Sequence, residues 1–223
     1  MSKLILVPTP IGNLKDITLR ALDNLKEADI ILAEDTRKTK NLLNHYKIEN
    51  KLLSYHKFNE HFIKDKIISK IKNGLTIALV TDAGTPGISD PGFLIIRECI
   101  NNQIEVESLP GATAFIPALL NSGLPCDKFI FEGFLPVKKG RKSRLESLST
   151  EKRTIIIYES PYRIEKTIND LIKYFSPERN ISISKELTKI HETTIRGTLS
   201  EINSKLKSVI IKGEFIVVIE GKK

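Results

Sequence analysis

The most informative stretch of the chain is residues 80–92, with the sequence VTDAGTPGISDPG. Its glycines and prolines define a loop whose backbone can approach a ligand closely. The loop follows an apolar run of strand length, and in an open α/β sheet ligands bind at the carboxyl ends of strands. A long turn leading into the next helix would have the same composition, so both interpretations stay open. The spacing of Gly84 and Gly87 fits neither a P-loop nor a GxGxxG fingerprint, which disfavours a nucleoside triphosphate.

Two further segments combine a strand end with small or rigid residues. Residues 109–114 read LPGATA, and a helix that begins there leaves free N–H groups able to bind a carboxylate, such as that of an amino-acid-like cofactor. An ordinary helix start explains the same residues equally well. Residues 7–13 (VPTPIGN) end the first apolar run, and proline there keeps the exit rigid while it removes a backbone donor.

Glu34, Asp35 and Arg37 place two carboxylates and a guanidinium at another junction between a strand and a helix. A carboxylate at such a place can accept a proton from a reacting hydroxyl, and the guanidinium can orient it or bind a phosphate. Asp35 or Thr36 can equally serve as the cap of the following helix. Taken alone, the segment is compatible with either role.

Residues 136–144 (PVKKGRKSR) form a basic segment. Its cations are Lys138, Lys139, Arg141, Lys142 and Arg144. The whole chain has 35 Lys and Arg against 27 Asp and Glu, a formal charge of +8 and a pI of about 9.3. This excess favours a polyanionic partner, and the basic segment is the predicted phosphate contact. A solvated surface loop is the alternative, because most runs of charge have no partner.

Composition limits the class of protein. The chain has 223 residues, of which 40% are hydrophobic and 28% charged, as is typical of a folded globular protein. Cys99 and Cys126 form no CxxC pair and the four histidines show no HExxH spacing, so we expect neither a disulfide framework nor a metal site. No apolar run reaches the roughly 20 residues of a membrane span and no signal peptide is recognisable, which predicts a cytoplasmic protein with no membrane partner.

Short apolar runs alternate with amphipathic helical stretches, which is typical of an α/β fold. In the first half the expected strands are 4–7, 29–33, 52–54, 76–80 and 105–109. In the second half they are 129–131, 154–158, 180–184, 193–197 and 214–219, and the short helix between the last two predicts that they form an antiparallel pair. Turn-forming residues at 121–127 (NSGLPCD) follow an apolar helix at 112–120. They predict two domains, 1–121 and 122–223, each a mostly parallel sheet flanked by helices.

Seven segments, taken in order, resemble the tetrapyrrole methylases. They are residues 7–21, 33–43, 80–92, 109–125, 131–136, 158–164 and 185–192. Relatives that methylate porphyrin precursors usually carry a Gly-Asp-Pro version of the loop at 80–92, whereas this chain has Thr81, Asp82 and Ala83. In this respect it is similar to the branch of the family that methylates a ribose 2′-hydroxyl in bacterial 16S ribosomal RNA.

The resemblance implies the two-domain tetrapyrrole-methylase fold, a homodimer, and S-adenosylmethionine held in a cleft between the domains. The matching cofactor positions are Pro8, Thr81, Asp82, Thr85, Thr113, Ala114, Glu159 and Leu187. The implied substrate is 16S ribosomal RNA within the small ribosomal subunit, methylated at the cytidine known as position 1402. The alternatives are a methyltransferase acting on a tetrapyrrole or another small molecule, and a non-catalytic RNA-binding assembly factor.

Methyl transfer from a sulfonium to a ribose hydroxyl needs alignment in a dry cleft and a base for the hydroxyl proton. We expect Glu34 or Asp35 to be that base, with Arg37 orienting them or binding a phosphate; His56 and Glu60 are further candidates. Asp35→Ala should then lower turnover and leave cofactor affinity nearly unchanged. We expect the RNA to be held by its phosphates, with the target nucleotide splayed into the pocket and affinity falling steeply with salt. The expected phosphate contacts are Arg37, Lys38, Lys40 and the basic segment.

Overall fold

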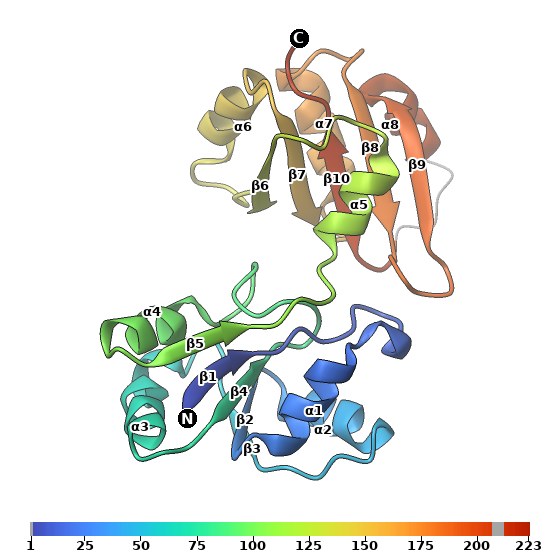
Figure 1. Ribbon diagram of the computed structural model, residues 1–223. Coiled ribbons are helices and arrows are strands. Elements are labelled where there is room, and N and C mark those ends of the chain that lie inside the picture. Colours follow the sequence, from blue (N-terminus) through green and yellow to red (C-terminus); the bar gives the residue numbers. More distant parts are fainter. Residues whose placement is uncertain (1, 207–211) are drawn as a thin grey trace. The chain divides into compact units, whose positions relative to one another are not determined.

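The computed structural model describes residues 2–206 and 212–223, and the chain divides into two compact units, Met1–Thr113 and Ala114–Lys223 (Figure 1). The division falls before the turn-rich stretch at 121–127 that marked the expected boundary. The reason is helix α5 (Phe115–Ser122), which packs on strands of the second unit rather than on the first sheet. The turn-rich stretch therefore ends a helix inside the second unit.

The first unit contains a five-stranded sheet in which all paired strands run parallel, in the order β3-β2-β4-β1-β5. The strands are β1 (Lys3–Leu6), β2 (Ile30–Ala33), β3 (Leu52–Ser54), β4 (Ile77–Val80) and β5 (Glu105–Ser108). Each lies where the sequence predicts a strand. All residues of the central strands β2 and β4 are buried, as expected where helices cover both faces of a parallel sheet.

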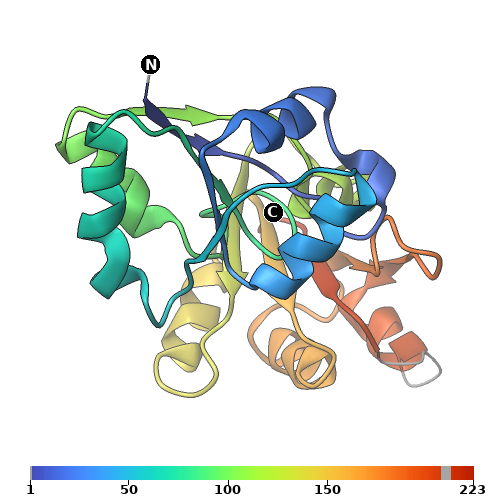
Figure 2. The ribbon, with the colours of Figure 1, turned by 90° about the horizontal axis from the view of Figure 1, so that it is seen from below.

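Helices cover both faces of this sheet (Figures 1 and 2). On one face lie α1 (Leu19–Glu27) and α2 (Thr36–His45), and on the other lie α3 (Glu60–Lys72) and α4 (Phe93–Asn101). Side chains alternate along each strand, so Ile31 packs in the core of α1 and α2 whereas its neighbour Leu32 packs in the core of α3 and α4. A short 3-10 helix, η1 (Leu14–Asp16), lies between β1 and α1.

The second unit has a five-stranded sheet of order β6-β7-β10-β8-β9. Its strands are β6 (Phe129–Phe134), β7 (Thr154–Glu159), β8 (Asn180–Lys185), β9 (Thr193–Thr198) and β10 (Phe215–Ile219). The α/β class is confirmed, but the expectation of a mostly parallel second sheet is wrong. Among the described strands only β6 and β7 pair in parallel, and the other three pairings are antiparallel.

The path of the chain after β8 explains this difference. The connection from β8 to β9 is short, and a short connection joins neighbouring strands only when they are antiparallel. Helix α8 (Leu199–Leu206) follows β9, and β10 then pairs with the other side of β8. The predicted pairing of the last two strands is therefore wrong, because each of them pairs with β8 instead.

Helices α6 (Arg141–Ser149), α7 (Ile164–Tyr174) and α8 cover one face of the second sheet (Figure 1). Their apolar side chains form one core with the sheet, as shown by Leu145, Ile168 and Ile202 packing with Ile157. On the opposite face, α5 contributes Phe115, which stacks on Phe131 of β6 with ring centroids 4.9 Å apart. No helix within residues 2–206 and 212–223 is both long and apolar enough to cross a bilayer.

Candidate functional site

The polar residues singled out in the first half of the sequence meet at one edge of the first sheet. Because β1, β2, β4 and β5 are parallel, their carboxyl ends lie on the same side. Residues 8–9 follow β1, 34–35 follow β2, 81–85 follow β4 and 109–113 follow β5. The parallel order thus brings together four segments that are far apart in the sequence.

The exit of β1 is tied to the glycine-rich loop. Thr9 and Gly84 exchange two backbone hydrogen bonds of 2.9 Å each, which form an isolated antiparallel bridge. The Thr9 hydroxyl also donates to the Thr81 carbonyl at 3.2 Å. Gly84 has φ +84°, a conformation that residues with a side chain rarely adopt, so glycine is needed for the loop to reach Thr9. Sequence reasoning singled out the segment around Thr9 but missed Thr9 itself.

The exit of β5 is held against the same loop. The Thr85 hydroxyl donates to the Ala112 carbonyl at 3.0 Å and lies 2.6 Å from the Thr113 hydroxyl. Gly111 lies so close to the β1 exit that an added Cβ would sit 2.6 Å from Pro8 Cβ. The side chains of Thr85 and Thr113 are therefore used to hold the loops together.

Asp82 connects the glycine-rich loop to the start of α2. Its carboxylate accepts from the Asp35 N–H at 3.0 Å and from Lys38 Nζ at 2.7 Å. The hydrogen bond to Asp82 raises the pKa of Lys38, which therefore stays protonated. The ion pair compensates the positive charge of Lys38 at this edge of the sheet.

Asp35 acts as the N-cap of α2, as one of the two interpretations proposed. Its Oδ1 accepts from the Arg37 N–H at 2.9 Å, and its carboxylate also binds the Arg37 side chain, with Nε at 3.1 Å and Nη2 at 2.7 Å. The side-chain hydrogen bonds from Arg37 hold the pKa of Asp35 well below its usual range. A carboxylate with so low a pKa is a poor acceptor for a proton at neutral pH.

Glu34 is the carboxylate better placed to accept a proton. It is half-buried directly after β2, and its Oε2 accepts a long hydrogen bond of 3.4 Å from the Asp82 N–H. The other two candidates follow β3, the outermost strand on this side of the sheet, and each also has a local hydrogen bond. His56 Nδ1 accepts from the Phe58 N–H at 3.3 Å, and Glu60 accepts from the Tyr55 hydroxyl at 3.3 Å.

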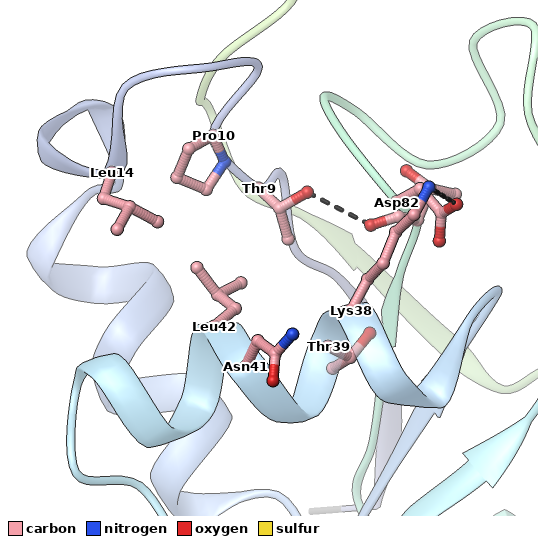
Figure 3. A pocket seen from close by; sticks show the side chains of 9 residues that line it. Thr9, Pro10, Leu14, Lys38, Thr39, Asn41, Leu42 and Asp82 are labelled. Carbon is pink, nitrogen blue, oxygen red and sulfur yellow. Dashed lines mark hydrogen bonds and ion pairs between the residues drawn. The ribbon is translucent and has the colours of Figure 1, made fainter.

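A cavity of about 320 Å³ opens beside these groups (Figure 3). Its lining combines the β1 exit and η1 with α2 and the β4 exit, namely Thr9, Pro10, Leu14, Lys38, Thr39, Asn41, Leu42, Thr81 and Asp82. One side is apolar, with Leu14 and Leu42, and the Lys38–Asp82 ion pair lies at another side. Thr81 is 2% exposed, and its hydroxyl has no hydrogen-bond partner among the described residues.

The second unit corrects one predicted phosphate contact. Arg141 is only 6% exposed, and its guanidinium donates to the side chains of Asp170 at 2.7 Å and Thr167 at 2.9 Å and to the Pro136 carbonyl at 3.1 Å. Buried in this way, Arg141 is not available to RNA. Its spacing from Leu145 and Leu148 places all three on one helical face, which is the signal that sequence reasoning overlooked.

The remaining cations of the basic segment differ in their surroundings. Lys138 and Lys139 are exposed, and Lys142 is exposed with only a loose contact of 3.8 Å to Glu146. Arg144 is bound through its guanidinium to Glu132 of β6. Phosphate contact thus fits the three lysines best.

Glu159, a predicted cofactor residue, is a buried carboxylate at the end of β7. It accepts from the Thr167 hydroxyl at 2.6 Å and the Ser160 N–H at 2.8 Å, and Arg163 Nε lies 3.4 Å away. Its side chain therefore belongs to an internal network. Leu187 is buried just after β8 and Ala114 immediately precedes α5, so both lie in the second unit.

Comparison with known proteins identifies the family. A family model described as Tetrapyrrole (Corrin/Porphyrin) Methylases matches residues 3–203. The chain belongs to this family. Uroporphyrin-III-C-methyltransferase from Thermus thermophilus superposes with a TM-score of 0.69 at 18% identity, covering 99% of this chain and 94% of that one. A structure of the same enzyme complexed with S-adenyl homocysteine gives a TM-score of 0.65 at 18% identity, covering 97% and 96%. These two likenesses show that the tetrapyrrole-methylase fold is shared.

Closer relatives carry the name Ribosomal RNA small subunit methyltransferase I. The protein from Thermotoga maritima is 46% identical over 222 residues, which cover 100% of both chains. The protein from Halalkalibacterium halodurans is 49% identical over 98% of this chain and 75% of its own length. The protein from Synechocystis sp. is 48% identical over 99% of this chain and 80% of its own length.

The sheet edge of this tetrapyrrole methylase has features that suit the cofactor of methyltransferases. The buried Thr81 hydroxyl is unpaired among the described residues, and Gly84 itself carries no side chain. Asp82, Thr85 and Thr113 use their side chains within the loops, so they would contribute mainly backbone contacts. Within residues 2–206 and 212–223, no cluster of His, Cys, Asp and Glu is arranged to bind a metal.

Proposed function

We propose that this chain transfers a methyl group from S-adenosylmethionine to the 2′-hydroxyl of a cytidine ribose, at position 1402 of 16S ribosomal RNA in the small ribosomal subunit. The observation that carries the choice of acceptor is the 46% identity to the Thermotoga maritima rRNA methyltransferase over the full length of both chains. The net charge of +8 supports an RNA acceptor over a small tetrapyrrole.

The proposal assigns cofactor binding to the carboxyl edge of the first sheet, through Pro8, Thr81, Asp82, Thr85 and Thr113. The expected contributions of Ala114, Glu159 and Leu187 from the second unit remain part of the proposal. When bound, S-adenosylmethionine supplies an electrophilic methyl group on a positively charged sulfur. Carboxylates at this edge favour a cation, and the Asp82 contact at 2.7 Å compensates Lys38, which would otherwise repel it.

Glu34 is the proposed general base for the ribose hydroxyl. A positioned base contributes roughly 10²–10⁴-fold to such a proton transfer. Arg37 leaves Asp35 a weak base by lowering its pKa, so we assign Asp35 to capping α2 and, through its N–H, to holding Asp82. Arg37, with a side chain 88% exposed, is free to bind a phosphate on its outer face.

RNA binding is proposed to use exposed cations of both units. Arg37 and Lys38 lie at the start of α2, and Lys138, Lys139 and Lys142 lie in the basic segment. Each phosphate neutralised releases counterions, so the affinity should fall steeply as salt rises. The proposal also includes action in the cytoplasm, where ribosomes are assembled, and a homodimer, which sedimentation equilibrium of the purified chain would test.

The deciding experiment supplies the purified chain with methyl-labelled S-adenosylmethionine and small ribosomal subunits from cells that lack this activity. We expect label at a single cytidine ribose, detected because 2′-O-methylation blocks alkaline cleavage at that nucleotide. Label that enters only a porphyrin precursor would favour the small-molecule alternative. Absence of saturable cofactor binding would favour a non-catalytic RNA-binding role.

The same assay tests the proposed base. Glu34→Gln should lower turnover by roughly 10²-fold or more and leave cofactor affinity nearly unchanged. The control is Glu27→Gln, which changes an exposed carboxylate at the end of α1, on the opposite edge of the sheet. Equal turnover of the Glu34→Gln variant and the wild type would reject Glu34 as the base.

A further inference from the structure

Two aromatic side chains stand out on the surface of the first unit. Phe58 and Phe62, between β3 and the first turn of α3, are 76% and 85% exposed. Isolated exposed apolar residues are common, but two exposed phenylalanines four residues apart in one short segment suggest a binding role. Neither residue belongs to the site described above.

The segment that carries these rings begins at the edge of the sheet that holds the candidate site. β3 pairs in parallel with β2, so its carboxyl end lies beside that of β2. The Tyr55 N–H donates to the Ala33 carbonyl at 2.8 Å, one residue before Glu34. The rings therefore follow the strand that neighbours the proposed general base.

The backbone that presents the rings is held by side-chain hydrogen bonds. Asn59 Oδ1 accepts from the His56 N–H at 2.9 Å, and its Nδ2 donates to the Ser54 carbonyl at 3.1 Å. Tyr55 is fully buried and its hydroxyl bonds to Glu60 at 3.3 Å. A preformed surface loses little conformational entropy when it binds a ligand.

A cation lies beside one of the rings. Lys57 Nζ lies 4.9 Å from the centre of the Phe58 ring, whereas Lys64, in the second turn of α3, is paired with Asp65 and Glu98. Aromatic rings next to cations suit single-stranded nucleic acid, because bases stack on the rings while the cations attract phosphates. An apolar protein partner would gain nothing from Lys57.

We propose that Phe58 and Phe62 form a stacking platform for unpaired bases that flank the target nucleotide of the RNA. The inference rests on the proposed function, since it identifies how the same acceptor strand is positioned. An aromatic ring can stack on any of the four bases, so the platform gives affinity and alignment with little sequence preference. Lys57 supplies a nearby phosphate contact.

The test measures binding of the full-length chain to a fluorescein-labelled single-stranded RNA by anisotropy, across a range of salt concentrations. Phe58→Ala and Phe62→Ala should each weaken binding by about 5- to 150-fold, the usual range for loss of one stacked base. The slope of log affinity against log salt should stay unchanged for both, whereas Lys57→Ala should reduce it by about 0.7. The control is Ile100→Ala, which removes an exposed apolar side chain near the end of α4 at the opposite edge of the sheet.

Phe58→Leu and Phe62→Leu separate stacking from general apolar contact. Leucine keeps apolar surface and loses the aromatic face, so we expect the leucine variants to bind RNA nearly as weakly as the alanine variants, and Phe58→Tyr to bind like the wild type. Wild-type affinity in the leucine or alanine variants would overturn the platform. A change of oligomeric state in the alanine variants, measured by sedimentation equilibrium, would also overturn it by assigning the rings to an interface between two copies of the chain.

The outcome for the platform is distinguishable from that for the proposed function. If the wild type methylates small subunits but the ring variants bind RNA normally, the platform is wrong and the function stands. If the wild type transfers no methyl group to RNA but the Phe58 and Phe62 variants bind RNA more weakly than the wild type, the function is wrong and the binding surface stands.

Discussion

Each unit contains a carboxylate and a guanidinium close together, exposed in the first unit and buried in the second. Asp35 and Arg37 lie at the surface, with the Arg37 side chain 88% exposed, and Arg37 meets no third side chain in the described contacts. Arg141 and Glu159 are buried, and the Thr167 hydroxyl joins them by accepting from one and donating to the other. Burial makes the second arrangement a structural element, whereas exposure leaves the first available to a ligand.

The largest expected effect comes from removing the buried guanidinium. Arg141→Ala leaves Asp170 and Thr167 without their donor and should lower the free energy of unfolding by about 3 kcal/mol, near the low end for a broken buried pair because Asp170 is partly exposed. Urea unfolding measures this loss. The neighbouring exposed Lys142→Ala is the control and should change stability by less than about 0.5 kcal/mol. Equal stability of the two variants would mean that the buried Arg141 stabilises the fold no more than an exposed cation does.

A smaller loss is expected from removing the hydroxyl that links the buried charges. Thr167→Val keeps the shape of the side chain but leaves Glu159 and Arg141 each without one partner, at a cost of about 2 kcal/mol. Thr167→Ser keeps the hydroxyl and should retain more stability than the valine variant in the same urea titration. The opposite order would mean that packing of the methyl group, rather than the hydrogen bonds, stabilises this region.

At the exposed pair, Asp35 should contribute less to stability, and its contribution should depend on pH in a defined direction. Its pKa is lowered in the folded state, so the stabilisation is fully present above the unfolded value of about 3.9 and is lost as pH falls through the lower folded value. The difference in thermal midpoint between the wild type and Asp35→Ala should therefore be constant from about pH 5 to 8 and shrink below about pH 4. A difference that grows on acidification would contradict the low pKa.

Asparagine at position 35 separates capping from charge in the methyl-transfer assay. Asp35→Asn keeps an oxygen that caps α2, so it should retain more turnover than Asp35→Ala, which was expected to lose activity. If Asp35→Asn instead loses as much turnover as Glu34→Gln, Asp35 is the base after all.

The smallest effect on stability is expected for Arg37. Arg37→Ala should leave the urea midpoint unchanged within error, because an exposed ion pair contributes little. Binding of single-stranded RNA should weaken, with the salt slope reduced by about 0.7 if the guanidinium contacts one phosphate. A clear loss of stability with unchanged RNA binding would mean that Arg37, like the buried Arg141, has a structural role.

Local hydrophobic patterns predicted the strands and helices. The expected parallel pairing of the first sheet predicted which loops lie together at the carboxyl ends of its strands. The ten described strands overlap the ten ranges predicted from the sequence, although β5 (EVES) and β9 (TTIRGT) are largely polar. The parallel-sheet rule placed Glu34, Thr81 and Asp82 at one edge. The partners within that edge, such as Lys38 with Asp82, could not be predicted, because they depend on the reach of single side chains across neighbouring loops.

The second unit was harder to predict because its arrangement depends on contacts between distant segments. The continuous apolar run of β10 (FIVVI) fits an interior strand and the polar β9 (TTIRGT) fits an edge strand, but local sequence does not show which strands β10 pairs with. The packing of α5 on β8 and β10 likewise joins residues far apart in the chain. The predicted phosphate contact of Arg141 is wrong because the prediction used only the number of basic residues in the segment. The helical spacing of Arg141 from Leu145 indicates the core instead.

Because Gly111 lies so close to Pro8, the residue allowed at one of these positions depends on the residue at the other, although most of the first unit separates them in the sequence. A methyl group at 111 would sit 2.6 Å from Pro8 Cβ and 2.9 Å from Pro8 Cγ, closer than carbon atoms can approach. Alanine at 111 is therefore accessible only in a lineage that has already replaced Pro8 or shifted the β1 exit. Across homologous chains, the two positions should consequently change together rather than one at a time.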